Sequence, residues 1–185
     1  QNILGKYPPF ISAKIFVPPV GCCAGVKPQL LSCYVKSGSG MPLHCRGERR
    51  RFKNAHFNYV PTYTGPGHAS IYTGTSPSTH GIIANDWYDK ETNAVVYCTD
   101  DKNAKTIGSD SKAGLMSPKK MLTTTIGDEL KINSNQRSKV FAISLKDRSS
   151  ILPAGHSANG AFWFDGTNGK FISSSHYMNQ LPEWL

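Results

Sequence analysis

The stretch Lys-Val-Phe-Ala-Ile-Ser-Leu-Lys-Asp-Arg, residues 139–148, decides the fold class. Its first seven residues, 139–145, form a nearly continuous apolar run, as expected for a parallel strand that is buried on both faces. Three charged residues, Lys146, Asp147 and Arg148, follow directly at the carboxyl end of this strand. Ligands of open α/β sheets bind outside the carboxyl ends of the strands. The stretch therefore predicts an α/β fold with a candidate binding edge at 146–148.

A helix is expected immediately before this strand. Leu122, Ile126 and Leu130 recur every four residues, which predicts an amphipathic helix over 119–132 with these side chains as its core stripe. A helix, then a buried strand, then a polar loop is the element order of an α/β fold.

Two further elements are expected after the strand. Residues 161–164 and 170–174 flank the turn sequence Asp-Gly-Thr-Asn-Gly at 165–169, which predicts a hairpin-like pair. Residues 182–185 resemble the start of another helix with proline in its first turn. The chain stops there without a C-terminal cap, so we interpret this last element as interrupted.

Short elements and loops are predicted between residues 57 and 118. Residues 57–62 are expected to form a strand-like segment, 65–67 a turn, and 68–73 a short helix that ends at Gly74. A loop is expected at 77–80. The segment 88–93 is expected to pair as a hairpin with a strand at 94–99, and a surface loop follows at 100–118. The strand at 94–99 is rich in β-branched residues, and Pro66 suits the first position of a helix.

The length and composition indicate one globular domain. A chain of 185 residues with 38% hydrophobic residues is long enough to bury a core and is not disordered throughout. It holds no run of about 18 apolar residues, so we expect no membrane span. Residues 1–21 carry four prolines and lack the apolar block and cleavage site of a secretory signal, so no signal peptide is visible.

The charge is concentrated at the start of the chain. The formal net charge is +9, and residues 1–53 hold nine Lys/Arg against one acid, whereas residues 54–185 are almost balanced. Four of the five cysteines also lie in this first part, and their spacings match no zinc template. We therefore predict a boundary after residue 52, between a basic, cysteine-containing segment at 1–52 and a domain at 53–185.

The basic segment has three interpretations. The cluster at 46–53 could bind nucleic acid or another acidic surface, or it could be a solvated basic loop. The third interpretation, which we favour, is that about the first 50 residues are irregular and not native to the domain, as in a misread frame. We favour the third interpretation because this stretch lacks clean periodicity and turn signals. Nucleic acid is therefore not the expected partner.

Thr64 is the candidate nucleophile. It lies just before the expected helix start, where unpaired backbone N–H groups and the helix dipole favour an anion. A threonine hydroxyl is a weak nucleophile, and a metal ion is the simplest way to activate it at neutral pH. The alternative is that Thr64 only caps the helix.

Three further residues could bind a phosphoryl group. The Asn85 amide can donate to a nonbridging oxygen, although an isolated Asn is commonly a turn residue. Lys146 and Arg148 occupy alternate positions, so in an extended segment both would point to one anion. The alternative is a solvated loop in which Asp147 pairs locally.

Together these residues resemble a known motif. Thr64-x-Pro66-Gly67-His68, followed by Thr73-Gly74, Pro77, His80-Gly81 and Asn85, resembles the nucleophile segment of the alkaline phosphatase superfamily. The similarity is closest to the type I phosphodiesterase/nucleotide pyrophosphatase branch and its single-chain, phosphate-irrepressible bacterial alkaline phosphatases. Residues 144–148, continuing through 151–156, also resemble the segment that supplies Lys and Arg in the monoesterases.

The resemblance covers about 52–185 and implies the fold and the site. The fold would be α/β, an incomplete part of an alkaline-phosphatase-like parallel-sheet sandwich, with 53–185 as the truncated N-terminal part of the catalytic domain. In this family the nucleophilic Thr binds one of two zinc ions, and an Asn 21 residues further on contacts the phosphoryl group; Thr64 and Asn85 have this separation.

The resemblance also implies an activity. Lys146 and Arg148 favour small phosphate monoesters, hydrolysed through a phosphothreonine on Thr64 that zinc-bound hydroxide then cleaves. A phosphodiesterase or nucleotide pyrophosphatase of the same superfamily is one alternative, and a noncatalytic nucleic-acid-binding module is another. The family implies a periplasmic or secreted location, and nothing indicates the oligomeric state.

The metal ligands depart from the family pattern. One Asp should lie near residue 23, but the first Asp of this chain is Asp86. The other Asp and His ligands of the family lie far downstream, beyond Leu185. His156 and His176 do not match the ligand spacing, so we assign them structural roles. We therefore expect the chain alone not to retain zinc or to be an active phosphatase, and we expect residues 1–50 not to form the first strand of the family.

Overall fold

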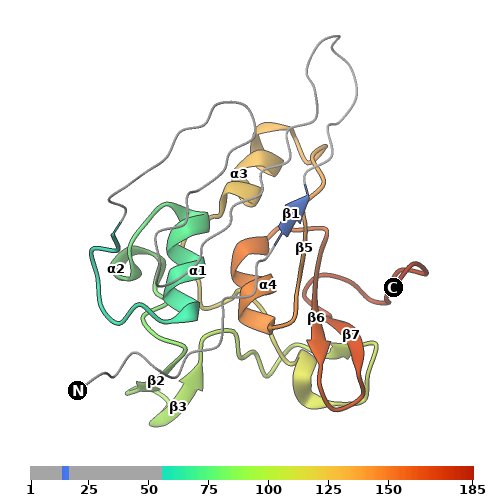
Figure 1. The fold of residues 1–185 in the computed structure, drawn as a ribbon, viewed down its shortest axis with the longest axis horizontal. Helices are drawn as coiled ribbons and strands as arrows, with labels where there is room; N and C mark the ends of the chain where they lie inside the picture. Colours follow the sequence, from blue (N-terminus) through green and yellow to red (C-terminus); the bar gives the residue numbers. More distant parts are fainter. Residues whose placement is uncertain (1–13, 17–55) are drawn as a thin grey trace.

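The computed structural model describes residues 14–16 and 56–185, and Figure 1 shows their arrangement. A five-stranded sheet has the order β1-β5-β6-β7-β4, and a separate hairpin pairs β2 with β3. The strands are β1 (Lys14–Phe16), β2 (Asp86–Asp89), β3 (Ala94–Tyr97), β4 (Thr106–Ile107), β5 (Phe141–Ser144), β6 (Gly160–Asp165) and β7 (Lys170–Ser174). The helices are α1 (Thr64–Thr73), α2 (Pro77–His80), α3 (Ile126–Asn133), α4 (Asp147–Ala154) and the 3₁₀ turn η1 (Lys112–Gly114).

The predicted α/β fold and its parallel strand are confirmed, but β5 is not buried on both faces as predicted, because Ile143 is 40% exposed. β5 pairs in parallel with β6, in a register that joins Phe141 to Gly160 and Ser144 to Trp163. The helix α4 connects them, as a parallel crossover requires. The predicted hairpin is also present, because β6 pairs antiparallel with β7.

β1 is relevant to the expectation that residues 1–50 do not form the first strand of the family. It runs antiparallel to β5, with Lys14 opposite Ile143 and Phe16 opposite Phe141. A parallel strand at 16–22 beside β5 would have contradicted our expectation; the three residues of β1 run in the opposite direction, and 17–22 lie outside the described residues. The remaining predictions for 1–52, including the domain boundary, also lie outside them.

The helix α4 lies between two hydrophobic clusters. Ile151 belongs to a cluster with residues of the sheet, and the next residue, Leu152, belongs to a cluster with α1. The sheet cluster comprises Ala142, Ile151, Ala154, Ala161, Trp163 and Ile172, and the second cluster comprises Ala69, Ile82, Cys98, Met121 and Leu152. Figure 1 shows α1 beside α4. The two clusters therefore fix α1 and the end of β3 relative to the main sheet, which positions the site described below.

The helix predicted over 119–132 is present only from Ile126 onward, and its predicted core stripe is wrong. α3 begins only at Ile126, because Thr125 and Asp128 form a capping box there. Leu122, Ile126 and Leu130 are 75%, 46% and 39% exposed. The buried face of α3 instead carries Gly127, Asp128 and Lys131. Long-range hydrogen bonds to Asp128 decide this orientation, and apolar periodicity could not reveal them.

Other segments also differ from the predictions. Residues 57–62 form no strand; Pro61 has no N–H to donate to a ladder, and Val60 is 90% exposed. The expected loop at 77–80 is the short helix α2, and the expected loop at 100–118 contains β4 and η1. Residues 182–185 form a turn that the hydrogen bond from Leu185 N to the Pro182 carbonyl closes, rather than a helix.

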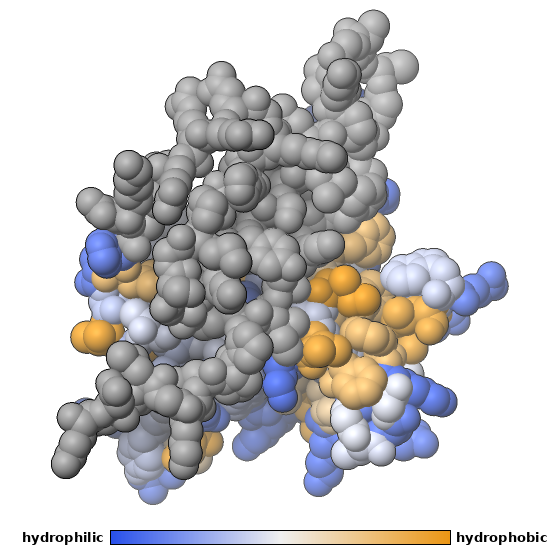
Figure 2. Space-filling view, in the orientation of Figure 1, coloured by the Kyte–Doolittle hydropathy of each residue, from blue (hydrophilic) through white to orange (hydrophobic). Residues whose placement is uncertain are grey.

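Hydrophobic side chains remain exposed on the main sheet. Ile143 of β5, the adjacent Leu145 and Phe164 of β6 are each about two-fifths to one-half exposed. Figure 2 shows hydrophobic residues on this face over the region of β5 and β6. Among the described residues, no helix is long and apolar enough to cross a membrane.

Candidate active site

Thr64 is the first residue of α1, and Tyr63 is its N-cap. The helix therefore starts four residues earlier than predicted, with Pro66 in its first turn. Proline is tolerated there because the first N–H groups of a helix have no intrahelical acceptor. The hydrogen bond of 2.9 Å from Gly67 N to the Tyr63 carbonyl closes this turn, and Gly74 ends the helix as predicted. Thr64 thus does not occupy the capping position, and its half-buried side chain lies at the positive end of the helix dipole.

Asn85 lies directly beside this helix start. Its Oδ1 accepts a hydrogen bond of 2.7 Å from Gly65 N, the residue after Thr64. Because an N–H must face an acceptor, this bond fixes the orientation of the amide and directs Nδ2, with its two N–H donors, away from Gly65. The structure therefore brings together Thr64 and an orientated amide donor that are 21 residues apart in sequence.

Gly65 leaves little room for a side chain at this contact. A Cβ atom there would lie 3.1 Å from the Ala84 carbonyl oxygen, 3.1 Å from Asn85 Oδ1 and 3.4 Å from Cys98 Sγ. The first two distances are tighter than ordinary van der Waals contacts, and one of the neighbours is backbone. A side chain at this position would require these neighbours to shift by a few tenths of an ångström.

Replacing Gly65 with alanine is expected to displace the Asn85 amide. If that amide contacts substrate, kcat/KM of the full-length protein should fall by about 10-fold to 100-fold, because misplaced transition-state contacts are costly. Steady-state kinetics would measure the loss. Gly67→Ala is the matched control, because a Cβ at Gly67 would meet nothing within 4 Å. Equal kinetics for the two variants would contradict the role of this contact.

Asn85 connects the helix start to β3. Its carbonyl accepts a hydrogen bond of 2.8 Å from Cys98 N, the residue after β3. The Cys98 thiol is fully buried, and its burial, followed by the nearby charge of Asp147, raises its pKa to about 12. The thiol is therefore neutral near pH 7 and acts as a packing group, not as a nucleophile.

Arg148 lies on α4 and reaches the end of β3. Its Nη1 donates a hydrogen bond of 2.6 Å to the Tyr97 hydroxyl, and its Cζ lies 5.8 Å from the centre of the Tyr97 ring. The same Nη1 is 3.9 Å from Asp147 Oδ1. Its side chain is 22% exposed. Arg148 is thus a partly buried cation held by specific contacts, not a solvated loop residue.

Lys146 differs from Arg148. It is the N-cap of α4 and is exposed, whereas Arg148 lies inside the first helical turn. The premise that both cations lie in one extended segment is therefore wrong, because the helix begins at Asp147. The structure places Thr64, Asn85 and Arg148 on connected elements, and it leaves the Lys146 side chain at the exposed N-terminus of α4.

His68 supports the backbone at Thr64. Its Nδ1 lies 2.8 Å from the Thr64 carbonyl oxygen, which can only accept, so Nδ1 carries the proton. The imidazole is 8% exposed, and its burial lowers the pKa; the Thr64 hydrogen bond raises it, and the charge of Arg148 lowers it further. The ring is neutral near pH 7 and fixes the first turn of α1.

Tyr97 is the site residue that sequence reasoning missed. Its hydroxyl contacts both Arg148 and Asp147, which are about 50 positions away in sequence. The only sequence signal for Tyr97 as a site residue was its position near the end of the predicted strand at 94–99. The contact itself depends on how the hairpin lies against α4.

The described residues do not fit a zinc site by themselves. Within 56–185, no group of three or more His, Cys, Asp or Glu side chains converges on a common point. His176 Nε2 lies 3.1 Å from the His156 carbonyl oxygen, and its ring packs edge-on against Tyr177. The His176 ring therefore has structural contacts, whereas the contacts described for His156 involve its backbone. The basic cluster at 46–53 lies outside the described residues.

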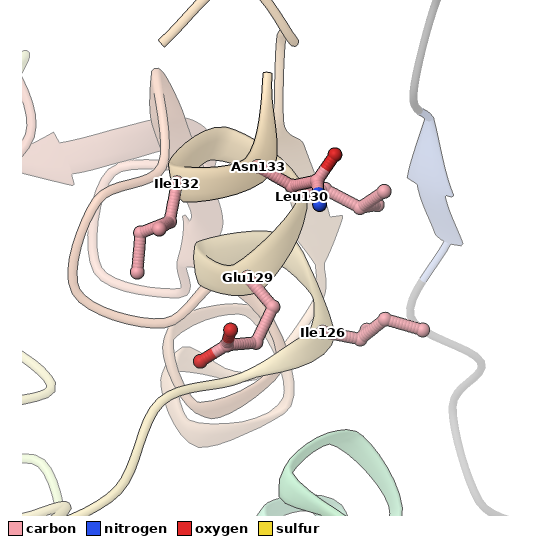
Figure 3. Close-up of a pocket in the computed structure, with 5 residues that line it drawn as sticks. All are labelled: Ile126, Glu129, Leu130, Ile132 and Asn133. Atoms are coloured by element: carbon pink, nitrogen blue, oxygen red, sulfur yellow. The ribbon is translucent and has the colours of Figure 1, made fainter. Parts of the chain in front are cut away.

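A pocket on α3 is separate from this site. Its lining residues are Ile126, Glu129, Leu130, Ile132 and Asn133, all from one helix. Figure 3 shows Ile126 and Leu130 pointing toward β1, whereas Glu129 and Ile132 point to the other side of the helix. None of the four predicted site residues lines it.

Comparisons with known proteins define the class. A family model described as type I phosphodiesterase / nucleotide pyrophosphatase matches residues 44–184. The chain therefore belongs to this family of the alkaline phosphatase superfamily, as the resemblance of its motifs indicated.

Individual relatives are alkaline phosphatases. The chain is 51% identical to alkaline phosphatase PhoV of Synechococcus elongatus over 152 residues. This alignment covers 82% of this chain and 28% of PhoV. The crystal structure of wild-type alkaline phosphatase PafA matches with a TM-score of 0.70 and 54% identity, over 71% of this chain and 25% of PafA. A PafA variant substituted at a threonine, an asparagine, a lysine and an arginine also matches with a TM-score of 0.70 and 51% identity, over 71% of this chain and 26% of the variant. The chain thus spans about a quarter of the length of these relatives.

Proposed function

We propose that the full-length protein carrying this chain hydrolyses phosphate monoesters, with Thr64 as the nucleophile. The observation that carries this proposal is the hydrogen bond of 2.7 Å between Gly65 N and Asn85 Oδ1, because it holds the Asn85 amide against the residue that follows Thr64, at the N-terminus of α1. This arrangement suits an anion that is attacked by a neighbouring hydroxyl.

The relatives support the choice of residues. The four residue types substituted in the PafA variant are the types of Thr64, Asn85, Lys146 and Arg148, in the same order. The first two are separated by 21 residues and the last two by two residues, as in this chain. We infer that these four side chains meet the reacting phosphoryl group.

In the proposed reaction, the Thr64 oxygen forms a bond to phosphorus while the bond from phosphorus to the ester oxygen breaks. The released alkoxide takes a proton and leaves as the alcohol, and water then attacks the phosphothreonine to release phosphate and regenerate Thr64. The Asn85 amide and the Arg148 guanidinium donate to the nonbridging oxygens. Lys146 reaches the group from the start of α4.

The proposed zinc dependence needs ligands beyond the described residues. Those residues supply Thr64 but no convergent set of carboxylates and imidazoles. We propose that a two-zinc site is completed by parts of the full-length protein that this chain does not span, and that the chain alone does not retain zinc. A periplasmic or secreted location likewise belongs to this proposal and follows from the resemblance to the family.

Comparing a monoester with a diester tests the substrate class. A doubly charged monoester terminus has more negative charge to satisfy than a diester, so the double variant Lys146→Ala/Arg148→Ala should lose more activity on p-nitrophenyl phosphate. We expect kcat/KM for this monoester to fall by about 100-fold or more, since charge-assisted hydrogen bonds are lost. The loss on bis-p-nitrophenyl phosphate should be at least about tenfold smaller.

The control variant is Lys139→Ala, which removes an exposed cation just before β5, at the opposite end from Lys146. Its kinetics should match those of the unmodified protein. A diester that is the better substrate, with equal losses on both esters, would instead indicate a phosphodiesterase or nucleotide pyrophosphatase.

A further inference from the structure

Three hydrogen bonds connect the first turn of α4 to the end of β3 and the residues that follow it. Arg148 Nη1 donates to the Tyr97 hydroxyl at 2.6 Å, and that hydroxyl donates to Asp147 Oδ1 at 3.0 Å. Asp147 Oδ2 accepts a third bond of 3.3 Å from the hydroxyl of Thr99, which is fully buried. The cluster joins the first turn of α4 to the end of β3 and its following residues.

The direction of these bonds is determined by chemistry. A guanidinium only donates and an ionised carboxylate only accepts, so the Tyr97 oxygen must accept from Arg148 and its single proton must go to Asp147. Thr99 also lies 3.5 Å from the Met116 sulfur, which is a weaker acceptor than a carboxylate. Tyr97 is therefore the group that fixes where Nη1 of Arg148 points.

This contact leaves the opposite edge of the guanidinium without a hydrogen-bond acceptor among the described residues. Nη1 lies on the side of the guanidinium that faces Cδ. The N–H groups of Nε and Nη2 therefore form the edge on the opposite side. Within the described part of the chain, neither Nε nor Nη2 is hydrogen-bonded to an acceptor, and Nε is buried. A buried donor without an acceptor is costly, and an incoming oxyanion would satisfy it. The pair of N–H groups on this edge matches two oxygens of a phosphoryl group.

Tyr97 remains an effective proton donor in alkaline solution. Burial raises the pKa of its phenol well above the usual value, and the negative charge of Asp147 raises it further. The neutral hydroxyl therefore keeps its proton for Asp147 and its lone pair for Arg148 over the whole range in which a free tyrosine would begin to ionise.

We propose that Tyr97 is a positioning residue, which holds Nη1 of Arg148 so that the Nε–Nη2 edge is presented to the phosphoryl group of the substrate. The orientation by Tyr97 is a property of this chain, and its use in binding substrate rests on the proposed function. Asp147 and Thr99 hold the Tyr97 hydroxyl in place.

The mobility of the Arg148 guanidinium tests this directly in the 185-residue chain. In ¹⁵N-labelled protein, rotation about the Nε–Cζ bond exchanges the signals of Nη1 and Nη2, and the Arg148→Lys variant assigns them. We expect separate signals in the unmodified chain and an exchange rate at least about tenfold faster in Tyr97→Phe, the factor expected for losing one hydrogen bond to a charged group.

Tyr88→Phe is the matched control. Tyr88 lies in the same hairpin, on β2, and its hydroxyl donates to Asn93 rather than to Arg148. Its removal should leave the Arg148 exchange rate unchanged. Separate signals that persist in Tyr97→Phe, or signals already averaged in the unmodified chain, would overturn the proposal.

The indole N–H of Trp163, which donates to the Ala113 carbonyl at 2.9 Å, reports whether each variant is folded. If Tyr97→Phe does not fold, the variant Asp147→Asn tests the same proposal, because it weakens the acceptor that orients the Tyr97 hydroxyl. The Arg148 exchange should then be faster than in the unmodified chain, and an unchanged rate would overturn the proposal.

Kinetics in the full-length protein separate this inference from the proposed function. Tyr97→Phe should lower kcat/KM for p-nitrophenyl phosphate by about tenfold, but cause no further loss in an Arg148→Ala background. The same tenfold loss in both backgrounds would overturn the positioning role. Full activity of Thr64→Ala would instead refute the proposed function, whatever the exchange rates show.

Discussion

Replacing Thr64 with alanine in the full-length protein is expected to lower kcat for p-nitrophenyl phosphate by about 10⁴-fold or more, the usual consequence of removing a nucleophile. Thr64 is the first residue of α1, and the backbone N–H of the next residue, Gly65, donates to the Asn85 amide. A steady-state assay measures the loss, and Thr75→Ala is the matched control because Thr75 lies beyond Gly74 at the other end of the helix. Activity of Thr64→Ala close to that of the unmodified protein would contradict the assignment.

The isolated chain provides a second test of the same site. Because the described residues hold no convergent set of metal ligands, we expect no zinc-dependent hydrolysis of p-nitrophenyl phosphate by the 185-residue chain. The assay compares the chain with added zinc and with a chelator. Zinc-dependent turnover that disappears in Thr64→Ala would show that the chain alone assembles a working site.

Replacing Asp128 with alanine is expected to have the largest effect on stability. Asp128 is 2% exposed, and its carboxylate accepts hydrogen bonds from Thr125, His156 and Ser157. These bonds join the start of α3 to the segment after α4, and a Cβ on Gly155 would collide with Asp128 Oδ2. Removing the carboxylate leaves several buried donors unsatisfied, so the free energy of unfolding should fall by about 3 kcal/mol or more.

Urea unfolding followed by Trp fluorescence would measure this change. The exposed Asp110 accepts no hydrogen bond from the described residues, so Asp110→Ala should change the free energy of unfolding by less than about 0.5 kcal/mol. Equal effects of the two substitutions would contradict the central role of Asp128.

The same carboxylate predicts an acid-sensitive fold. Burial alone would raise the pKa of Asp128, but the hydrogen bonds from Ser157, Thr125 and His156 outweigh it and lower the pKa below the usual value. A depressed pKa means that the stabilisation is fully present above the unfolded-state pKa of about 4 and is lost as the pH falls through the folded-state value. Between pH 5 and pH 3 the unmodified chain should therefore lose more stability than Asp128→Asn.

Local sequence patterns were reliable where an element is defined by its own residues. The apolar run at 139–145 predicted the parallel strand β5, and the turn sequence at 165–169 predicted the β6–β7 hairpin. The motif from Thr64 to Asn85 indicated the family, which the match over 44–184 confirms. In each case the information lies within about 20 consecutive residues.

Patterns failed where a distant part of the chain decides the outcome. The spacing of Leu122, Ile126 and Leu130 suggested a buried stripe, but hydrogen bonds from 156–157 turn Asp128 inward. Similarly, alternation along an extended segment suggested that Lys146 and Arg148 point the same way, but α4 begins between them at Asp147. Helix starts depend on which capping contacts the folded chain makes, so they were predicted least well.

The sequence by itself determined the fold class, the family and the four residues proposed to meet the phosphoryl group, because these follow from local periodicity and from a motif of fixed spacing. The tertiary structure alone decided how those residues are held. It placed the Asn85 amide against Gly65, and it joined Tyr97 to Arg148 across 51 positions. Such contacts have no sequence signature, since they arise only when α1, α4 and the β2–β3 hairpin pack around a common core.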